Sequence, residues 1–266
     1  LAPGAVIALA SVITGYCFVE AGWPLLPCAM AGLLVGIAAG LASSWLIVRM
    51  GLPPFIATLG LMSIARGAAL LFTDGRPVSG FDAGFRTIST GRPFAIPAPV
   101  ILMAMVYVVA HFILTRTTFG RYVYAIGGNE EATRLSGVRV GLHKTLIYVL
   151  SGITSAIAAV TLTARLNSAQ PIAGIMYELD AIAATVIGGT SLLGGSGTLV
   201  GTLIGALIMG VLRNGLNLLG ISSFLQQVVI GGVIIAAVLV DSLLNRRAQR
   251  RRARRAVELP RVAGTP

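Results

Sequence analysis

Charged side chains are scarce in this chain: only 11% of its 266 residues are charged, whereas 56% are hydrophobic. A soluble globular domain carries about twice that share of charge, so the composition excludes that class. Runs of about 20 apolar residues can cross a bilayer as helices. We therefore predict an all-α, polytopic membrane protein. Its eight expected spans are 3–19, 25–48, 53–73, 98–115, 145–164, 180–194, 197–220 and 224–244, and 180–194 is short enough to be a half-helix inside the bundle.

Residues with catalytic or ion-coupling chemistry are equally scarce. No acidic residue falls near the middle of a predicted span, which argues against a proton- or sodium-driven relay. The two cysteines and two histidines have no metal or redox spacing. Lys144 is the only lysine and follows His143 rather than glycine, so no Walker A motif exists. We expect a chain that is not an enzyme and binds no cofactor; if ATP is used, another subunit binds it.

The net charge of +11 lies mostly on one side of the predicted membrane. Fourteen of the 20 basic residues are Arg49, five residues of the 116–144 loop and eight residues of the C-terminal tail. If successive spans cross the membrane in alternating directions, these three segments lie on the same side. The positive-inside rule assigns this side to the cytoplasm. We predict a transmembrane domain over residues 1–245 and a basic cytoplasmic tail over 246–266. This placement favours a topological or lipid-contacting tail over a nucleic-acid site.

The 116–144 loop contains a polar segment with its own helix signals, after a break at Gly127 and Gly128. These signals are Asn129 as N-cap, Glu130 and Glu131 at the positive dipole end, Arg134 at the C-terminal end and Gly137 as the left-handed stop. They predict a helix of about two turns. Ala132, Leu135 and Ser136 share one small, mostly apolar face. Such a face suits a groove on another protein.

Small residues recur every four positions in several spans. The two clearest ridges are Gly32, Gly36 and Gly40, and Gly197, Gly201 and Gly205. Such ridges let helices approach closely in lipid. The alternative, a sliding surface for a conformational switch, needs the same residues and stays open.

Four polar residues are the expected lining of a translocation path: Arg66, Asp180, Asn214 and Asn217. Ionisable residues within spans usually face the bundle interior or a water-filled path. For Arg66, which falls well inside the 53–73 span, a structural hydrogen-bonding role stays equally open.

Four stretches of the chain are specific as a combination and in their order along the sequence. They are PFIATLG at 54–60 followed by Arg66 and Gly67, GRYVYAIGGNEEATRLSGV at 120–138, the run from RLNSAQP at 165 to IGAL at 207, and NGLNLLGISSFLQ at 214–226. In this combination the chain resembles the membrane-spanning permease subunit of ribose-type monosaccharide importers in the ABC transporter superfamily. The resemblance covers most of the chain.

This resemblance implies ten spans in a full chain, so two are expected to be missing before Leu1. It also implies a homodimer in the bacterial inner membrane, a cytoplasmic ATPase that binds ATP and Mg, a periplasmic sugar-binding protein, and import of ribose or a related pentose or hexose. The coupling helix that engages the ATPase is expected between Gly128 and Gly137. Its expected contacts are Gly128, Asn129, Glu130, Ala132, Leu135, Ser136 and Gly137.

A secondary transporter or facilitator is the alternative, with the loop lying on the membrane surface as an amphipathic helix. Surface helices usually place large apolar residues opposite basic ones. The small face and acidic start of the 129–136 segment argue against that alternative. An integral membrane enzyme is more distant still.

Overall fold

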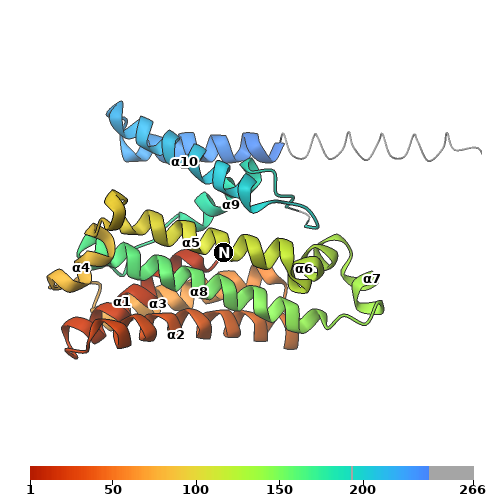
Figure 1. Ribbon diagram of the computed structural model, residues 1–266, viewed down its shortest axis with the longest axis horizontal. Helices are drawn as coiled ribbons and strands as arrows, with labels where there is room; N and C mark the ends of the chain where they lie inside the picture. Colours follow the sequence, from red (N-terminus) through yellow and green to blue (C-terminus); the bar gives the residue numbers. More distant parts are fainter. Residues whose placement is uncertain (193, 240–266) are drawn as a thin grey trace, which may run out of the picture. The chain divides into compact units, whose positions relative to one another are not determined.

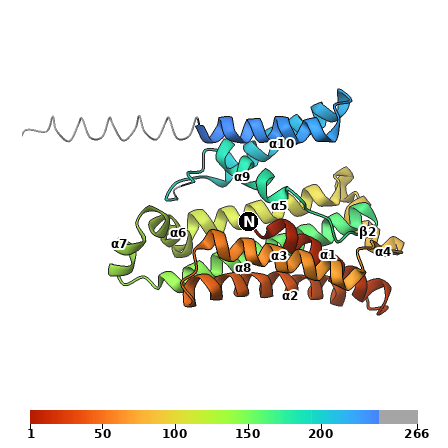
Figure 2. The same cartoon turned by 180° about the vertical axis from the view of Figure 1, so that it is seen from behind.

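The computed structural model describes residues 1–192 and 194–239. These residues form two compact units, residues 1–179 and residues from Asp180 onward, which are described separately. The first unit contains α1 (Pro3–Val19), α2 (Leu25–Ser44), a π-helical turn η1 (Trp45–Arg49), α3 (Pro54–Thr73), β1 (Val78–Ser79), α4 (Ala83–Thr90), a 3-10 turn η2 (Pro93–Ala95), α5 (Ala98–Arg116), α6 (Thr118–Gly128), α7 (Glu130–Leu135), α8 (Val140–Leu166) and β2 (Ser168–Ala169). It is a helical bundle, shown from two sides in Figures 1 and 2.

Helix α1 is the centre of the first unit and packs against α2, α3 and α8. Proline at its first position suits a helix start, because the missing N–H would have no partner there. Its core side chains are small: Ala5, Ala8, Ala10 and Val12 are fully buried. Small side chains bring the helix axes close together, which is how helices pack in lipid.

The predicted ridge of Gly32, Gly36 and Gly40 on α2 is a packing surface, as expected. A Cβ at Gly32 would meet the Thr14 hydroxyl of α1, and a Cβ at Gly36 would meet the backbone of Gly152 on α8. Gly40 lies equally close to the backbone at Tyr148. The backbones of α2 and α8 therefore touch along several turns.

The two ends of this bundle are built differently. Figure 1 shows α4 at one end and α6 with α7 at the opposite end, here called the α4 end and the α7 end. At the α4 end, β1 pairs antiparallel with β2, with Val78 opposite Ala169. Phe81 and Phe85 lie with ring centroids 4.5 Å apart, and Phe18 of α1 stacks on Phe81 at 5.6 Å. The sequence reasoning did not predict this ribbon, this aromatic cluster or α4.

The second unit holds α9 (Tyr177–Ile187), which begins in the last residues of the first unit, α10 (Leu199–Leu218) and an apolar helix Ser223–Leu239. A Cβ at Gly201 would meet the carbonyl of Gly188, and one at Gly205 would meet the carbonyl of Ala184. The second predicted ridge therefore also packs closely, here between α9 and α10. Gly197 has φ +153° and lies against Thr190.

Most predicted spans coincide with helices. Within the part of the chain that the structure describes, five helices are long and apolar enough to cross a membrane: Leu25–Arg49, α3, α5, α8 and α10. The predicted spans 3–19 and 224–244 coincide with shorter apolar helices, as far as the described residues reach. The expected half-helix at 180–194 corresponds to the 11-residue α9, which begins at Tyr177 and ends at Ile187, so the predicted end at 194 was too far along the chain. The total number of crossings stays a prediction, and the division at residue 245 and the 246–266 tail lie outside the described residues.

The structure of the 116–144 loop differs from the expectation in two ways. It holds two helices rather than one, because α6 precedes α7. Helix α8 begins at Val140, inside the expected loop, rather than at residue 145. Since α8 is 27 residues long, it extends past the apolar span by more than one turn.

Replacing Gly36 with alanine should destabilise the bundle by about 1–3 kcal/mol, because the added methyl group meets the backbone of Gly152. Gly60 on α3 is the matched control, since a Cβ there meets nothing within 4 Å. Gly60→Ala should be neutral or stabilise by up to about 1 kcal/mol through helix propensity. Thermal unfolding of the purified protein in detergent measures both; equal stabilities would contradict the close contact.

Candidate functional site

Helix α6 leads from α5 into the loop and packs against the start of α8. Thr117 caps it by accepting a hydrogen bond from the N–H of Gly120 at 3.4 Å. The His143 ring of α8 stacks on Phe119 at 5.9 Å and meets Tyr122 edge-on at 4.9 Å. The apolar residues Phe119, Val123 and Ile126 have helical spacing and could have revealed α6 from the sequence.

The geometry of α7 confirms the predicted capping. The Asn129 side-chain oxygen accepts from the N–H of Ala132 at 2.9 Å, and Gly137 has φ +85°. Glu130 and Glu131 lie in the first turn and Arg134 in the last. Thr133 is buried on the inner side. The opposite face, with Ala132, Leu135 and Ser136, is exposed, and Leu135 is 81% accessible.

An ion pair joins α7 to α8. The Lys144 ammonium donates to both carboxylate oxygens of Glu130 at 2.7 Å. Arg134 approaches the same carboxylate at 3.4 Å. The hydrogen bond from Lys144 lowers the pKa of Glu130 below its ordinary value; partial desolvation opposes this, and the charges of Lys144 and Arg134 add to it.

Arg66 holds a non-helical segment inside the bundle. Its guanidinium donates to the carbonyl of Pro171 at 3.0 Å and to that of Ala173 at 2.6 Å. Irregular backbone at membrane depth needs such partners, because lipid offers none. Gly174, with φ +70°, packs its backbone on Gly4 of α1, where no side chain would fit. The structural role expected for Arg66 is therefore observed, whereas its path-lining role stays a prediction.

The other three predicted path residues belong to the second unit. Asp180 accepts a hydrogen bond from Arg213 at 2.6 Å, which links α9 to α10. Asn217 accepts from the Gln226 amide at 2.8 Å, and Asn214 is exposed. Asp180 and Asn217 thus tie helices of this unit together, and a translocation role for them or for Asn214 stays a prediction.

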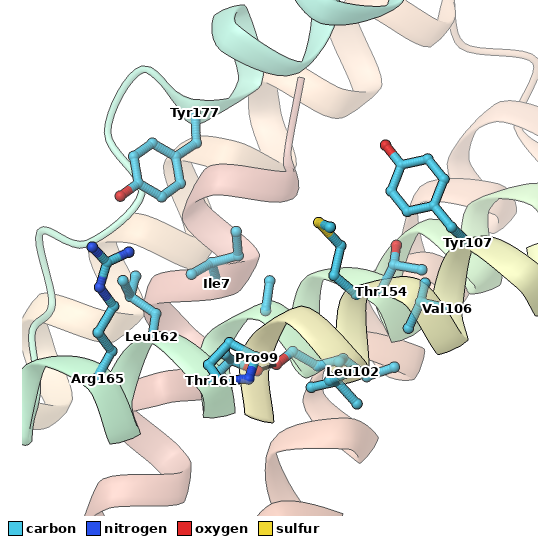
Figure 3. Close-up of a pocket in the computed structure, with 13 residues that line it drawn as sticks. Ile7, Pro99, Leu102, Val106, Tyr107, Thr154, Thr161, Leu162, Arg165 and Tyr177 are labelled. Atoms are coloured by element: carbon cyan, nitrogen blue, oxygen red, sulfur yellow. Dashed lines mark hydrogen bonds between the residues drawn. The ribbon is translucent and has the colours of Figure 1, made fainter. Parts of the chain in front are cut away.

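A cavity of about 380 Å³ lies in the first unit between α5 and α8 (Figure 3). Its wall is mostly apolar, with a few hydroxyl groups and one guanidinium. It is lined by Ile7, Pro99, Leu102, Met103, Val106, Tyr107, Thr154, Ile157, Ala158, Thr161, Leu162, Arg165 and Tyr177. Figure 3 shows the polar groups of Arg165 and Tyr177 at the same end of the cavity. An apolar pocket of this size with a few polar groups is typical of small-molecule sites.

None of these lining residues was predicted as a site residue. Most are ordinary apolar residues of the α5 and α8 spans, and Arg165 was expected in an outer segment. Only the separation of two helices that are far apart in sequence creates the cavity. No local pattern signals that separation.

Residues 1–238 match the family model described as branched-chain amino acid transport system / permease component. Alignments with three curated relatives each cover between 217 and 246 residues. The ribose import permease protein of Bacillus subtilis (strain 168) is 49% identical over 243 residues, which are 91% of this chain and 75% of that protein. The D-allose transport system permease protein of Escherichia coli (strain K12) is 40% identical over 246 residues, covering 92% and 76%.

The third relative, the L-arabinose transport system permease protein of Escherichia coli (strain K12), is 42% identical over 217 residues. These residues are 79% of this chain and 66% of that protein. No solved structure matches the chain.

The contact between α7 and α8 should weaken in acid. Because the folded-state pKa of Glu130 is lowered, the ion pair stabilises the loop at pH values above the ordinary glutamate pKa of about 4.3. That contribution is lost as the pH falls through the lowered pKa. Amide exchange of α7, corrected for its intrinsic pH dependence, should therefore rise only in that acidic window. In Glu130→Gln the rise should vanish; if it persists, another group causes it.

Replacing Arg66 with methionine should destabilise the first unit by about 1–3 kcal/mol, because two carbonyl groups inside the bundle lose their donor. Thermal unfolding in detergent measures the loss. Arg76→Met, at an exposed arginine of the α4 end, is the control and should change stability little. Equal effects of the two substitutions would show that the carbonyl contacts contribute nothing.

Proposed function

The chain belongs to the branched-chain amino acid transport permease family, and from this premise we propose that it is the membrane-spanning subunit of an ABC importer for a monosaccharide. The all-α, multi-pass architecture suits this role, because packed helices leave no backbone group unsatisfied in lipid. ATP and Mg would bind to a separate ATPase subunit, and the lack of a Walker A motif in this sequence agrees with that assignment.

The substrate class is proposed from the relatives rather than from the family's description. That description mentions amino acids, whereas the three relatives are named for ribose, D-allose and L-arabinose. Identities of 40–49% over most of the chain favour the relatives as guides. Ribose or a related pentose or hexose is the proposed cargo, and the hydroxyl-bearing cavity beside α8 is a suitable place for it to pass.

Helix α7 is the single observation that supports ATPase docking most strongly. It is capped at both ends by its own residues, anchored by Glu130, and exposes Leu135 at the tip of the bundle. Most exposed leucines among the described residues lie on long apolar helices, where lipid would cover them. Leu135 lies on a short charged helix at the end of the bundle, where a protein groove is the fitting environment.

The remaining partners follow from the same proposal. We place the α7 end and the C-terminus in the cytoplasm of a bacterial cell, with the α4 end facing the periplasm and a sugar-binding protein. A second copy of the permease completes the translocation unit. ATP binding would move α7 as a rigid element, and the bundle would alternate between inward- and outward-open packings.

The test that separates this proposal from a secondary transporter is sugar uptake into proteoliposomes. The permease would be reconstituted with and without its ATPase subunit and ATP. We expect uptake only when both are present. Uptake that persists without any ATPase would favour the secondary transporter.

Leu135→Asp should abolish co-purification of the ATPase while leaving membrane insertion intact, because it puts an unpaired charge into the docking groove. Leu219→Asp is the matched control, since Leu219 is 76% exposed at the far end of α10, on the side assigned to the periplasm. It should retain the ATPase. A Leu135→Asp protein that still binds the ATPase and imports sugar normally would place the contact elsewhere.

A further inference from the structure

The start of α8 is held by three consecutive side chains that contact three different elements. His143 packs on the aromatic rings of α6, Lys144 binds Glu130 of α7, and the Thr145 hydroxyl lies 2.6 Å from that of Ser44 on α2. Successive residues of a helix point about 100° apart. The three contacts therefore lie on different sides of α8, and Lys144 makes the contact with α7.

The charges around Lys144 make Glu130 its natural partner. The first turn of α8 contains no acidic residue and follows Arg139. Positive charge near a helix N-terminus is unfavourable, and a carboxylate from another element offsets that cost. Glu130 supplies it with both oxygens, and the pair is only partly exposed, at 28% for Lys144 and 39% for Glu130.

Beyond Lys144, α8 meets its closest neighbour at Gly152. There the backbones of Gly152 and Gly36 touch with no room for a side chain on either helix. Gly152 lies eight residues, about 12 Å, along the helix from Lys144. Only small groups meet there, namely the two glycine backbones and the methyl group of Ala156, so α2 and α8 lie close together at this point.

On the far side of this contact, α8 forms one wall of the cavity. Thr154, Ile157, Thr161 and Arg165 line it, and Figure 3 shows the Arg165 side chain directed toward Tyr177. Thr161 is nine residues, about 14 Å, beyond Gly152. One continuous helix therefore carries the α7 contact, the backbone contact and the cavity wall in that order.

We infer that the Glu130–Lys144 ion pair is the link through which α7 moves α8, tilting it at the Gly36–Gly152 contact so that the cavity wall shifts relative to α5. Glu130 and Lys144 are then positioning residues for transport. This inference rests on the proposed function, because the ATPase supplies the movement of α7.

The test uses the complete importer in proteoliposomes: permease, ATPase and sugar-binding protein. Three permease variants break or reverse the pair, namely Glu130→Gln, Lys144→Met and the exchange Glu130→Lys with Lys144→Glu. Lys144→Met keeps the aliphatic stem and removes only the charge. Glu131→Gln is the matched control, because Glu131 pairs with Arg134 of its own helix at 3.6 Å and not with α8.

Sugar molecules imported per ATP hydrolysed are the main readout. We expect this ratio to fall roughly threefold to tenfold in both single variants, the range of a partly exposed charged hydrogen bond, and to recover in the exchange variant. Glu131→Gln should match the unaltered protein. A normal ratio in the single variants, or an exchange variant as impaired as they are, would overturn the inference.

A second readout reports on the cavity wall directly. Thr161→Cys, in a background without Cys17 and Cys28, should react with a small thiol reagent at a rate that changes when ATP is added. Lys144→Met should abolish that change while the ATPase still co-purifies. If ATP still changes the reaction rate in Lys144→Met, the Glu130–Lys144 ion pair does not transmit the movement of α7 to α8. If the unaltered permease binds no ATPase, the proposed function fails instead.

Discussion

The contact between the backbones of Gly36 and Gly152 is the constraint on which the first unit depends. Lipid tails are as apolar as side chains, so helices in a membrane associate through close dispersion contacts and hydrogen bonds. At this contact α2 and α8 come close enough for the Ser44 and Thr145 hydroxyls to meet two turns further on. The loop helices at one end and the cavity wall near the other both depend on where α8 lies.

A second constraint concerns backbone that is not helical. The segment between β2 and α9 enters the bundle, where Pro171 is buried and its carbonyl has no water to bind. Arg66 removes that cost, with one guanidinium nitrogen serving two carbonyls. Hydrogen bonding thereby accounts for the presence of Arg66 within a span.

Local signals allowed the best predictions. The N-cap at Asn129 and the left-handed Gly137 depend on residues within one turn of α7, so the sequence alone indicated them. The spans followed from hydropathy, and the glycine ridges followed from spacing. Helix α6 was not predicted although Phe119, Val123 and Ile126 carry its periodicity, because its three glycines have low helix propensity. The two-residue strands β1 and β2 have no periodicity to detect.

Features that join distant parts of the chain could not be predicted. Arg213 was expected inside a span and Asp180 near the outer surface, yet the two form an ion pair across 33 positions of sequence. Glu130 was expected to favour the helix dipole and to contact the ATPase, whereas its bond to Lys144 depends on how the loop folds back. The cavity depends on the distance between α5 and α8. Each of these requires knowing which helices are neighbours.

The β1–β2 ribbon and the cluster of Phe18, Phe81 and Phe85 have a mechanical consequence. The ribbon fastens the connection between α3 and α5 to the connection between α8 and α9, and the rings fasten α4 to the end of α1. Two connections that are far apart in the sequence therefore belong to one cluster with α4 and the end of α1. None of these parts can shift alone without breaking the strand pairing or the ring contacts.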